Sequence, residues 1–179
     1  MDLRCGDEVI VPSYTFVATG LAVLYNNARP VIVDVEKDKY VVDPKLVVSA
    51  LTKHTKGIIA VHMHGFPAPM KELWDIAREN DLFLIEDAAQ AFGLDYRGAK
   101  LGTWGEIGCF SFHQRKIIST GGEGGAVVTP WRHYADRIRS LKNFGRNEYG
   151  VALEVGFNYK MSDSAAEEGL KQLPEIKKR

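Results

Sequence analysis

The chain has 179 residues, of which 45% are hydrophobic and 26% are charged, a composition typical of one soluble globular domain with a sizeable core. Its 23 basic and 23 acidic residues balance, so no overall charge favours nucleic acid or an anionic membrane surface as a partner. No apolar run reaches bilayer-spanning length, and no apolar segment of a signal peptide follows Met1. The two cysteines, Cys5 and Cys109, lie far apart in the sequence and are expected to be reduced thiols of a cytoplasmic protein.

Strand signals recur along the first half of the chain. Continuous apolar runs predict strands at residues 8–12, 30–34, 57–62 and 82–85. Runs that are apolar throughout, rather than alternating, are typical of strands buried on both faces of a parallel sheet.

Three helices are predicted between these strands. Ser13 or Thr15 is expected to cap the first helix. The apolar face expected for it consists of Val17, Leu21, Leu24 and Tyr25. Asp43 followed by Pro44 predicts the start of the second helix. Its expected buried side consists of Leu46, Val47, Ala50 and Leu51. The third helix has apolar residues at i, i+3, i+4 and i+7, which are Met70, Leu73, Trp74 and Ala77.

A lysine and a glycine-rich turn separate two further apolar runs. Strands are predicted at 109–112 and 125–129, with Lys116 and the turn Gly121–Gly125 between them. A helix with Tyr134, Ile138 and Leu141 on one face is predicted to follow. An ordinary solvated lysine is one interpretation of Lys116. The other is a Schiff-base lysine, because a site that desolvates an amine makes it nucleophilic.

The alternation of strands and helices predicts an α/β fold, a mostly parallel sheet covered by helices on both faces. Ligands of such sheets bind beyond the carboxyl ends of the strands. The residues that leave these ends include Ser13, Tyr14, Thr15, Phe16, His62, His64, Glu86, Asp87, Gln90, Ser111, His113 and Lys116. They offer a carboxylate, an amide, an amine, hydroxyls and aromatic rings, which is the set of groups that pyridoxal phosphate requires.

Six segments match, in the same order, those of a known enzyme family. They are Pro12–Thr19, Val61–Gly65, Glu86–Gly93, Cys109–His113 with Lys116, Gly121–Gly125 and Gly156–Asp163. In these segments the chain resembles the sugar aminotransferases of the DegT/DnrJ/EryC1/StrS family, and the resemblance covers nearly the whole chain. It implies the fold type I architecture, which is like that of aspartate aminotransferase, and the cofactor pyridoxal 5'-phosphate. Members of the family move an amino group, usually from glutamate, to a keto sugar carried on a nucleotide.

The resemblance implies a role for each of five residues in the first two thirds of the chain. Lys116 would be catalytic, because it would form the Schiff base with the cofactor and shuttle the proton. Asp87 would bind the pyridinium nitrogen, and Gln90, three residues further on, would bind the phenolic oxygen. Ser111 would contact the phosphate, and Phe16 would stack on the ring.

The resemblance also implies a partner and a domain organisation. Asn158 would reach the phosphate from the neighbouring subunit, which implies a homodimer with shared active sites. Residues 1–150 would form the central part of the cofactor-binding large domain, and residues 151–179 would start the connection to a C-terminal small domain. The family segment that precedes Gly6 and the small domain itself are expected to be absent, as in a truncated copy or one piece of a split protein.

Several site residues have an ordinary alternative. Asp87 could be a helix cap, Gln90 a surface residue, Ser111 a neutral strand end and Phe16 a core residue. Glu86 precedes Asp87 in an extended segment and would point to the opposite face, so a structural role is expected for it.

Two other site types are not supported. His62 and His64 could pair on a metal ion, but no third ligand with suitable spacing is visible, so no metal site is predicted. A nicotinamide-binding enzyme is not indicated, because no Gly-x-Gly-x-x-Gly follows the first strand. Dehydratases related to the family carry histidine in place of the lysine, so Lys116 argues against that reaction.

The last segment departs from the family pattern. Glu167 and Glu168 stand where the family has small or apolar residues on a helix face that is expected to be packed, and Pro174 interrupts the helical pattern. Lys160 replaces the usual arginine and removes its bidentate fork. The alternative to an enzyme is therefore a non-catalytic or cofactor-binding remnant, or an interaction module that needs a partner chain.

Overall fold

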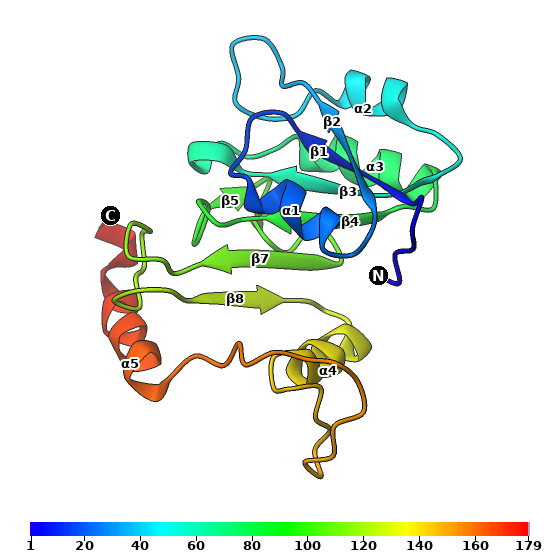
Figure 1. Ribbon diagram of the computed structural model, residues 1–179. Coiled ribbons are helices and arrows are strands. Elements are labelled where there is room, and N and C mark those ends of the chain that lie inside the picture. Colours follow the sequence, from blue (N-terminus) through cyan, green and yellow to red (C-terminus); the bar gives the residue numbers. More distant parts are fainter. Residues whose placement is uncertain (179) are drawn as a thin grey trace. The chain divides into compact units, whose positions relative to one another are not determined.

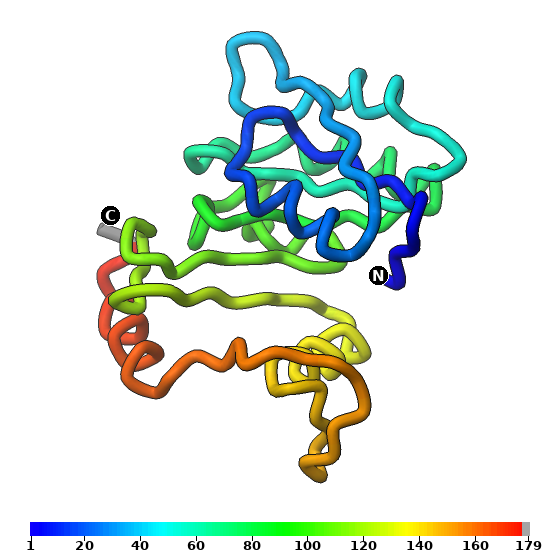
Figure 2. The backbone as a smooth tube through the Cα atoms, in the orientation of Figure 1, coloured from blue at the N-terminus to red at the C-terminus, as the bar shows by residue number. Residues whose placement is uncertain are grey.

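A computed structural model describes residues 1–178 of the chain, apart from the side chains of Lys177 and Lys178. The chain divides into two compact units, Met1–Phe110 and the part from Ser111 onward (Figure 1, Figure 2). No helix of the described residues is long and apolar enough to cross a bilayer.

The first unit is built on parallel strands in the order β2-β1-β3-β4-β7. Their bounds are Glu8–Pro12 for β1, Arg29–Val33 for β2, Thr55–Val61 for β3, Phe83–Asp87 for β4 and Ile107–Ser111 for β7. After β1 the chain forms β2 on one side and β3 on the other (Figure 1). The strand order therefore reverses between β1 and β3, which is where open α/β sheets bind their ligands.

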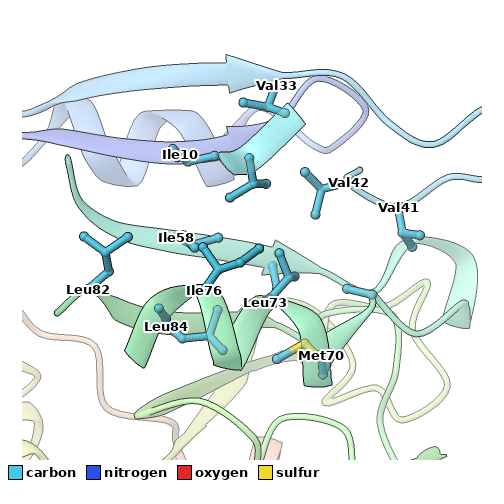
Figure 3. Close-up of a cluster of buried hydrophobic side chains, with 14 of the residues drawn as sticks. Ile10, Val33, Val41, Val42, Ile58, Met70, Leu73, Ile76, Leu82 and Leu84 are labelled. Carbon is cyan, nitrogen blue, oxygen red and sulfur yellow. The ribbon is translucent and has the colours of Figure 1, made fainter. Parts of the chain in front are cut away.

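Two hydrophobic clusters cover the two faces of this sheet, because successive side chains of a strand point to opposite faces. Ile10, Ile58 and Leu84 face one cluster, which also contains residues of α2 (Pro44–Ala50) and α3 (Met70–Glu79) (Figure 3). Val9 and Val11 face the other cluster with Val23 of α1 (Ala18–Leu24). The first unit thus has the predicted three layers, with helices on both faces of a parallel sheet.

The prediction for α1 was wrong in two respects. Neither predicted hydroxyl caps the helix: the N-cap residue is Val17, which makes no side-chain capping bond, while Ser13 donates its hydroxyl hydrogen to Oδ1 of Asp34. The predicted apolar face is also largely exposed, at 61% for Val17, 52% for Leu24 and 80% for Tyr25. The buried residues of α1 are instead Thr19 and Val23. The buried face of the helix therefore includes a hydroxyl, whereas the predicted face consisted of apolar side chains.

The other two helices follow their predictions more closely. Asp43 caps α2 and accepts a hydrogen bond from the backbone N–H of Lys45, although only Val47 of the predicted face is buried. In α3 the buried residues are Met70, Leu73, Ile76 and Ala77. The predicted Trp74 lies at the margin, where the guanidinium of Arg78 covers its ring.

A short hairpin was not predicted. β5 (Asp95–Tyr96) and β6 (Ala99–Lys100) pair in antiparallel fashion. Arg97 and Gly98 join them with φ values of 46° and 84°, as a two-residue hairpin turn requires.

The second unit contains β8 (Gly125–Val128), α4 (Arg132–Leu141), α5 (Asp163–Gln172) and the 3₁₀ helix η2 (Leu173–Lys178). The segments on either side of its glycine-rich turn pair through backbone hydrogen bonds. Phe112 and Gln114 donate their N–H groups to the carbonyls of Gly124 and Gly122.

Helix α5 packs on this turn region through a small residue. Gly169 is buried, and a Cβ added there would lie 3.3 Å from Cγ2 of Thr120. Glu167 and Glu168 are exposed, so the expectation that they occupy a packed face was wrong within this unit. The helix ends two residues before Pro174, where the pattern predicted an interruption.

Candidate functional site

Asp87 is the last residue of β4, and its carboxylate is held on both oxygens. Oδ2 accepts a hydrogen bond of 2.8 Å from the hydroxyl of Thr19, and Oδ1 accepts one of 3.2 Å from the backbone N–H of Ala89. The Thr19 hydroxyl is itself 2.8 Å from that of Thr15. A carboxylate can accept about four hydrogen bonds, so this one is fixed in place and can still receive a further donor.

Gln90 lies in the turn after β4 and contacts the loop after β3. Its Oε1 accepts a hydrogen bond of 3.0 Å from the backbone N–H of His64, and its Nε2 donates to Sδ of Met63 at 3.2 Å. Because a backbone N–H can only donate, this contact determines which end of the amide faces His64. One hydrogen of the amide nitrogen remains for a ligand. His64 has a φ of 53°, a value that non-glycine residues rarely adopt.

Aromatic rings surround the carboxyl ends of β1, β2 and β3. The ring of Tyr40 is 5.6 Å from Tyr14, 5.2 Å from His64 and 5.8 Å from Phe66, measured between centroids. The Tyr14 hydroxyl lies 3.3 Å from Nε2 of His64. The side chain of Phe16 is 71% exposed, so its ring is not a core residue and is available to stack on a flat ligand.

Cys109 lies on β7 opposite Asp87 in the parallel register. Burial of the thiol is the main cause that raises its pKa from an ordinary 9.0 to about 11, and the negative charges of Asp87 and Glu86 add to the effect. Ionisation of the thiol at this strand end is therefore disfavoured, first by burial and then by the two neighbouring carboxylates.

The other candidate residues belong to the second unit. Ser111 is the last residue of β7, and its Oγ accepts a hydrogen bond from the backbone N–H of His113. Lys116 is half-buried, and among the side chains that the structure describes its Nζ makes no hydrogen bond or ion pair. Asn158 is exposed and forms an isolated backbone bridge with Asn143.

The two units thus divide the candidate residues between them. Phe16, Asp87 and Gln90 stand at one edge of the sheet in the first unit, where Thr19 links Asp87 to the segment that follows β1. Ser111, Lys116 and Asn158 follow in the second unit. In the part of the chain that the structure describes, no three His, Cys, Asp or Glu side chains form a metal-binding group.

Thr19 contacts a residue of the candidate site and was missed by the sequence reasoning. A threonine inside a helix is usually read as neutral, and no charge or unusual spacing marks it. The signal that could have found it is the pair of hydroxyl residues, Thr15 and Thr19, in the segment directly after a predicted strand, where ligands of such sheets bind.

Comparison with known proteins identifies the chain with one family over its whole length. The model of the DegT/DnrJ/EryC1/StrS aminotransferase family matches residues 1–179. The chain is 40% identical to the dTDP-3-amino-3,4,6-trideoxy-alpha-D-glucose transaminase of Streptomyces venezuelae, over 90% of its own length and 42% of that protein. It is 39% identical to the GDP-perosamine synthase of Escherichia coli O157:H7, over 94% and 46%. The chain therefore spans about half the length of these curated relatives.

Solved structures show the same fold. The aminotransferase from Psychrobacter cryohalolentis superposes with a TM-score of 0.95 at 34% identity, covering 99% of this chain and 48% of that one. The NtdA structure from Bacillus subtilis, which has the cofactor PMP bound, superposes with a TM-score of 0.90 at 32% identity, covering 97% and 40%. The chain belongs to the DegT/DnrJ/EryC1/StrS aminotransferase family, whose members depend on pyridoxal phosphate.

Proposed function

We propose that this protein is a pyridoxal phosphate-dependent aminotransferase that transfers an amino group from glutamate to a keto sugar carried on a nucleotide. The observation that carries the proposal is the fixed carboxylate of Asp87, which retains the capacity to accept one more donor at the carboxyl edge of the sheet. The names of two relatives, a dTDP-sugar transaminase and a GDP-perosamine synthase, support a nucleotide-linked sugar as the substrate.

The residues present fit this cofactor by their chemistry. A protonated ring nitrogen needs an acceptor that remains ionised, and Asp87 has one hydrogen bond on each oxygen to hold it. The exposed ring of Phe16 offers a stacking surface. Lys116 offers an amine that has no competing acid partner among the described side chains.

Pyridoxal phosphate, when bound, supplies an electron sink for the charge that develops when a C–H bond of the substrate breaks. Asp87 would hold the proton on the ring nitrogen, so that the sink stays electron-poor. Gln90 would donate its remaining amide hydrogen to the phenolic oxygen, and the Ser111 hydroxyl would bind the phosphate. Nζ of Lys116 would attach the cofactor and then carry the proton from one carbon to another.

We infer that the working protein is a homodimer in the cytoplasm, in which Asn158 completes the phosphate site of the neighbouring subunit. Its exposed position supports this role, because a side chain that contacts another subunit has to be accessible in the single chain.

The proposal is tested by cofactor capture and by turnover. The purified chain is mixed with pyridoxal phosphate, reduced with borohydride and mapped by peptide mass spectrometry. We expect the added mass on Lys116, its loss in Lys116→Ala, and its retention in Lys142→Ala, which removes an exposed lysine of the same unit. An adduct that is unchanged in Lys116→Ala would contradict the proposal.

Turnover is then measured as 2-oxoglutarate released from glutamate in the presence of a nucleotide-linked keto sugar. Release that depends on both substrates and on Lys116 supports the aminotransferase. Cofactor capture on Lys116 without any release would instead support a protein that only binds the cofactor.

A further inference from the structure

Glu86 lies one residue before Asp87 on β4 and is completely buried, with 0% exposure. Neighbouring side chains of a strand point to opposite faces, so Glu86 lies behind the candidate site and not in it. A buried carboxylate is costly unless hydrogen bonds replace its water. Its partners therefore show what this group holds together.

Four N–H groups converge on the Glu86 carboxylate. Oε2 accepts from Nε2 of His62 at 2.9 Å and from the backbone N–H of Gly102 at 2.7 Å. Oε1 accepts from the backbone N–H groups of Trp104 at 2.6 Å and Gly105 at 2.8 Å. Four bonds fill the acceptor capacity of an ionised carboxylate, so no lone pair is left for a ligand. Three of the four donors belong to one turn, residues 102–105.

His62 connects this carboxylate to the end of β3. Its Nδ1 accepts a hydrogen bond of 3.1 Å from the backbone N–H of Ala68, so the ring proton is on Nε2 and points at Glu86. The backbone N–H of His62 also donates to the carbonyl oxygen of Asp87 at 3.1 Å. One residue thus binds the Glu86 side chain and the Asp87 main chain together.

The 102–105 turn approaches β4 so closely at Gly105 that only glycine fits there. A Cβ at Gly105 would lie 2.2 Å from the carbonyl oxygen of Leu84, which is a backbone atom of β4. On the other side of the turn, a Cβ at Gly102 would lie 2.3 Å from Cζ of Phe110 on β7. The turn is therefore packed directly on the strand, and the Glu86 carboxylate is the group that gathers its amides.

We propose that Glu86 is a positioning residue of the candidate cofactor site, which immobilises the end of β4 so that Asp87 keeps its place on the opposite face. This inference rests on the proposed function, because it assigns Asp87 to the cofactor. On one face of the strand end the clamp consists of His62 and the 102–105 turn. On the other face the Asp87 carboxylate accepts hydrogen bonds from the Thr19 hydroxyl and the Ala89 N–H.

The first experiment needs no cofactor. Amide hydrogen exchange of the full chain is followed by NMR at Ala89, whose N–H binds Asp87, and at Ile10 in the core. In Glu86→Gln one carboxylate oxygen becomes an amide nitrogen that cannot accept from its two donors. We expect exchange at Ala89 to be about tenfold faster or more while Ile10 keeps its rate, since opening would be local. Asp87→Ala gives the exchange rate of the Ala89 N–H when its hydrogen bond to the Asp87 carboxylate is absent.

Glu106→Gln is the matched control, because the Glu106 side chain accepts the backbone N–H of Leu84 on the same strand but lies away from Asp87 in the register. It should leave exchange at Ala89 unchanged. If Glu86→Gln does not fold, His62→Leu is measured in its place, because it removes one of the four bonds and leaves the turn attached. Unchanged protection at Ala89, or an equal acceleration at Ile10, would overturn the proposal.

The second experiment measures pyridoxal phosphate affinity by titration. If Glu86 acts through Asp87, then Glu86→Gln weakens binding about tenfold in the wild-type background and has no further effect in Asp87→Asn. The same factor in both backgrounds would indicate a role in general stability only and would overturn the inference. A wild-type chain that takes up no cofactor would refute the proposed function, and the exchange rates at Ala89 would still decide the role of Glu86.

Discussion

The carboxylate of Asp87 is held in place by hydrogen bonds from uncharged groups, the Thr19 hydroxyl and the Ala89 N–H. Its place after a strand and its spacing from Gln90 were visible in the sequence, and the family pattern assigned it to the ring nitrogen. The sequence did not show that a helix hydroxyl, that of Thr19, would reach across from the segment after β1 to bind it. Such a contact depends on how a helix lies on a sheet, which no local pattern encodes.

The Thr19 hydroxyl is expected to matter for cofactor binding. Replacing it in Thr19→Val keeps the shape of the side chain and removes a hydrogen bond to a charged group, which contributes about 1.5–3 kcal/mol. We expect pyridoxal phosphate to bind about tenfold more weakly or worse, measured by fluorescence titration. Ser49→Ala, which removes an exposed hydroxyl that donates to the carbonyl of Lys45 in α2, should bind like the wild type; an equal loss in both variants would contradict the role of Thr19.

Cys109 makes stability depend on alkaline pH. Because the folded chain raises the pKa of this thiol from 9.0 to about 11, the folded state keeps a proton that the unfolded state loses in that interval. The stabilisation is complete below pH 9 and is lost as the pH rises to 11, by roughly 3 kcal/mol. The free energy of unfolding, measured with urea from pH 8 to pH 11, should fall more steeply for the wild type than for Cys109→Ala.

The matched control for this pH dependence is Cys5→Ala, which removes an exposed thiol. It should show the same fall as the wild type. Identical slopes for the wild type and Cys109→Ala would contradict a raised pKa of the Cys109 thiol in the folded chain.

At the scale of elements, the 102–105 turn leaves no room for a Cβ at Gly105. An alanine at Gly105 would place its Cβ 2.2 Å from the carbonyl oxygen of Leu84, so either the turn or the strand has to move. We expect Gly105→Ala to lower the free energy of unfolding by about 2–4 kcal/mol. Gly20→Ala is the comparison, since nothing lies within 4 Å of that site in α1 and helix propensity favours alanine by up to about 1 kcal/mol.

The helices and strands of the first unit could be predicted with different completeness: the bounds of some elements, the position but not the buried face of others, and not the β5–β6 hairpin. β1 was predicted residue for residue, because a short apolar run between a glycine and a proline allows few alternatives. The position of α1 was also predicted, but its buried face was not, because several apolar residues on two sides of a short helix fit more than one packing. The β5–β6 hairpin was missed because two-residue strands have too few residues to show any alternation.

At the scale of the whole molecule, a stripe of apolar side chains in the second unit is the surface to test for self-association. Every second residue from 149 to 159 is apolar and more than half exposed: Tyr149, Val151, Leu153, Val155, Phe157 and Tyr159. This 149–159 stripe also brackets Asn158, the residue proposed to serve a neighbouring subunit. Large exposed apolar side chains gathered in one segment are typical of a protein interface.

The proposed homodimer can be tested by placing a charge in this stripe. Val155 and Leu153 are 87% and 71% exposed, so aspartate at either position costs little in the single chain and much in an interface. We expect wild-type protein to sediment as a concentration-dependent dimer and Val155→Asp or Leu153→Asp to shift it toward monomer. Ile32→Asp, at a position that is 69% exposed in the first unit, is the control. Equal sedimentation of all variants would argue against the stripe as the interface.

The outer margin of the sheet has a consequence for solution behaviour. β2 pairs with β1 alone among the described strands, and the backbone N–H of Arg29 points inward, where it donates to the carbonyl of Asp7. By alternation, the nitrogens of Pro30 and Ile32 point outward, and proline has no hydrogen to offer. A strand of a second molecule that paired with β2 would meet one outward N–H donor, that of Ile32, instead of two. Pro30 therefore disfavours the growth of fibrils from this edge, and it removes no hydrogen bond between β2 and β1.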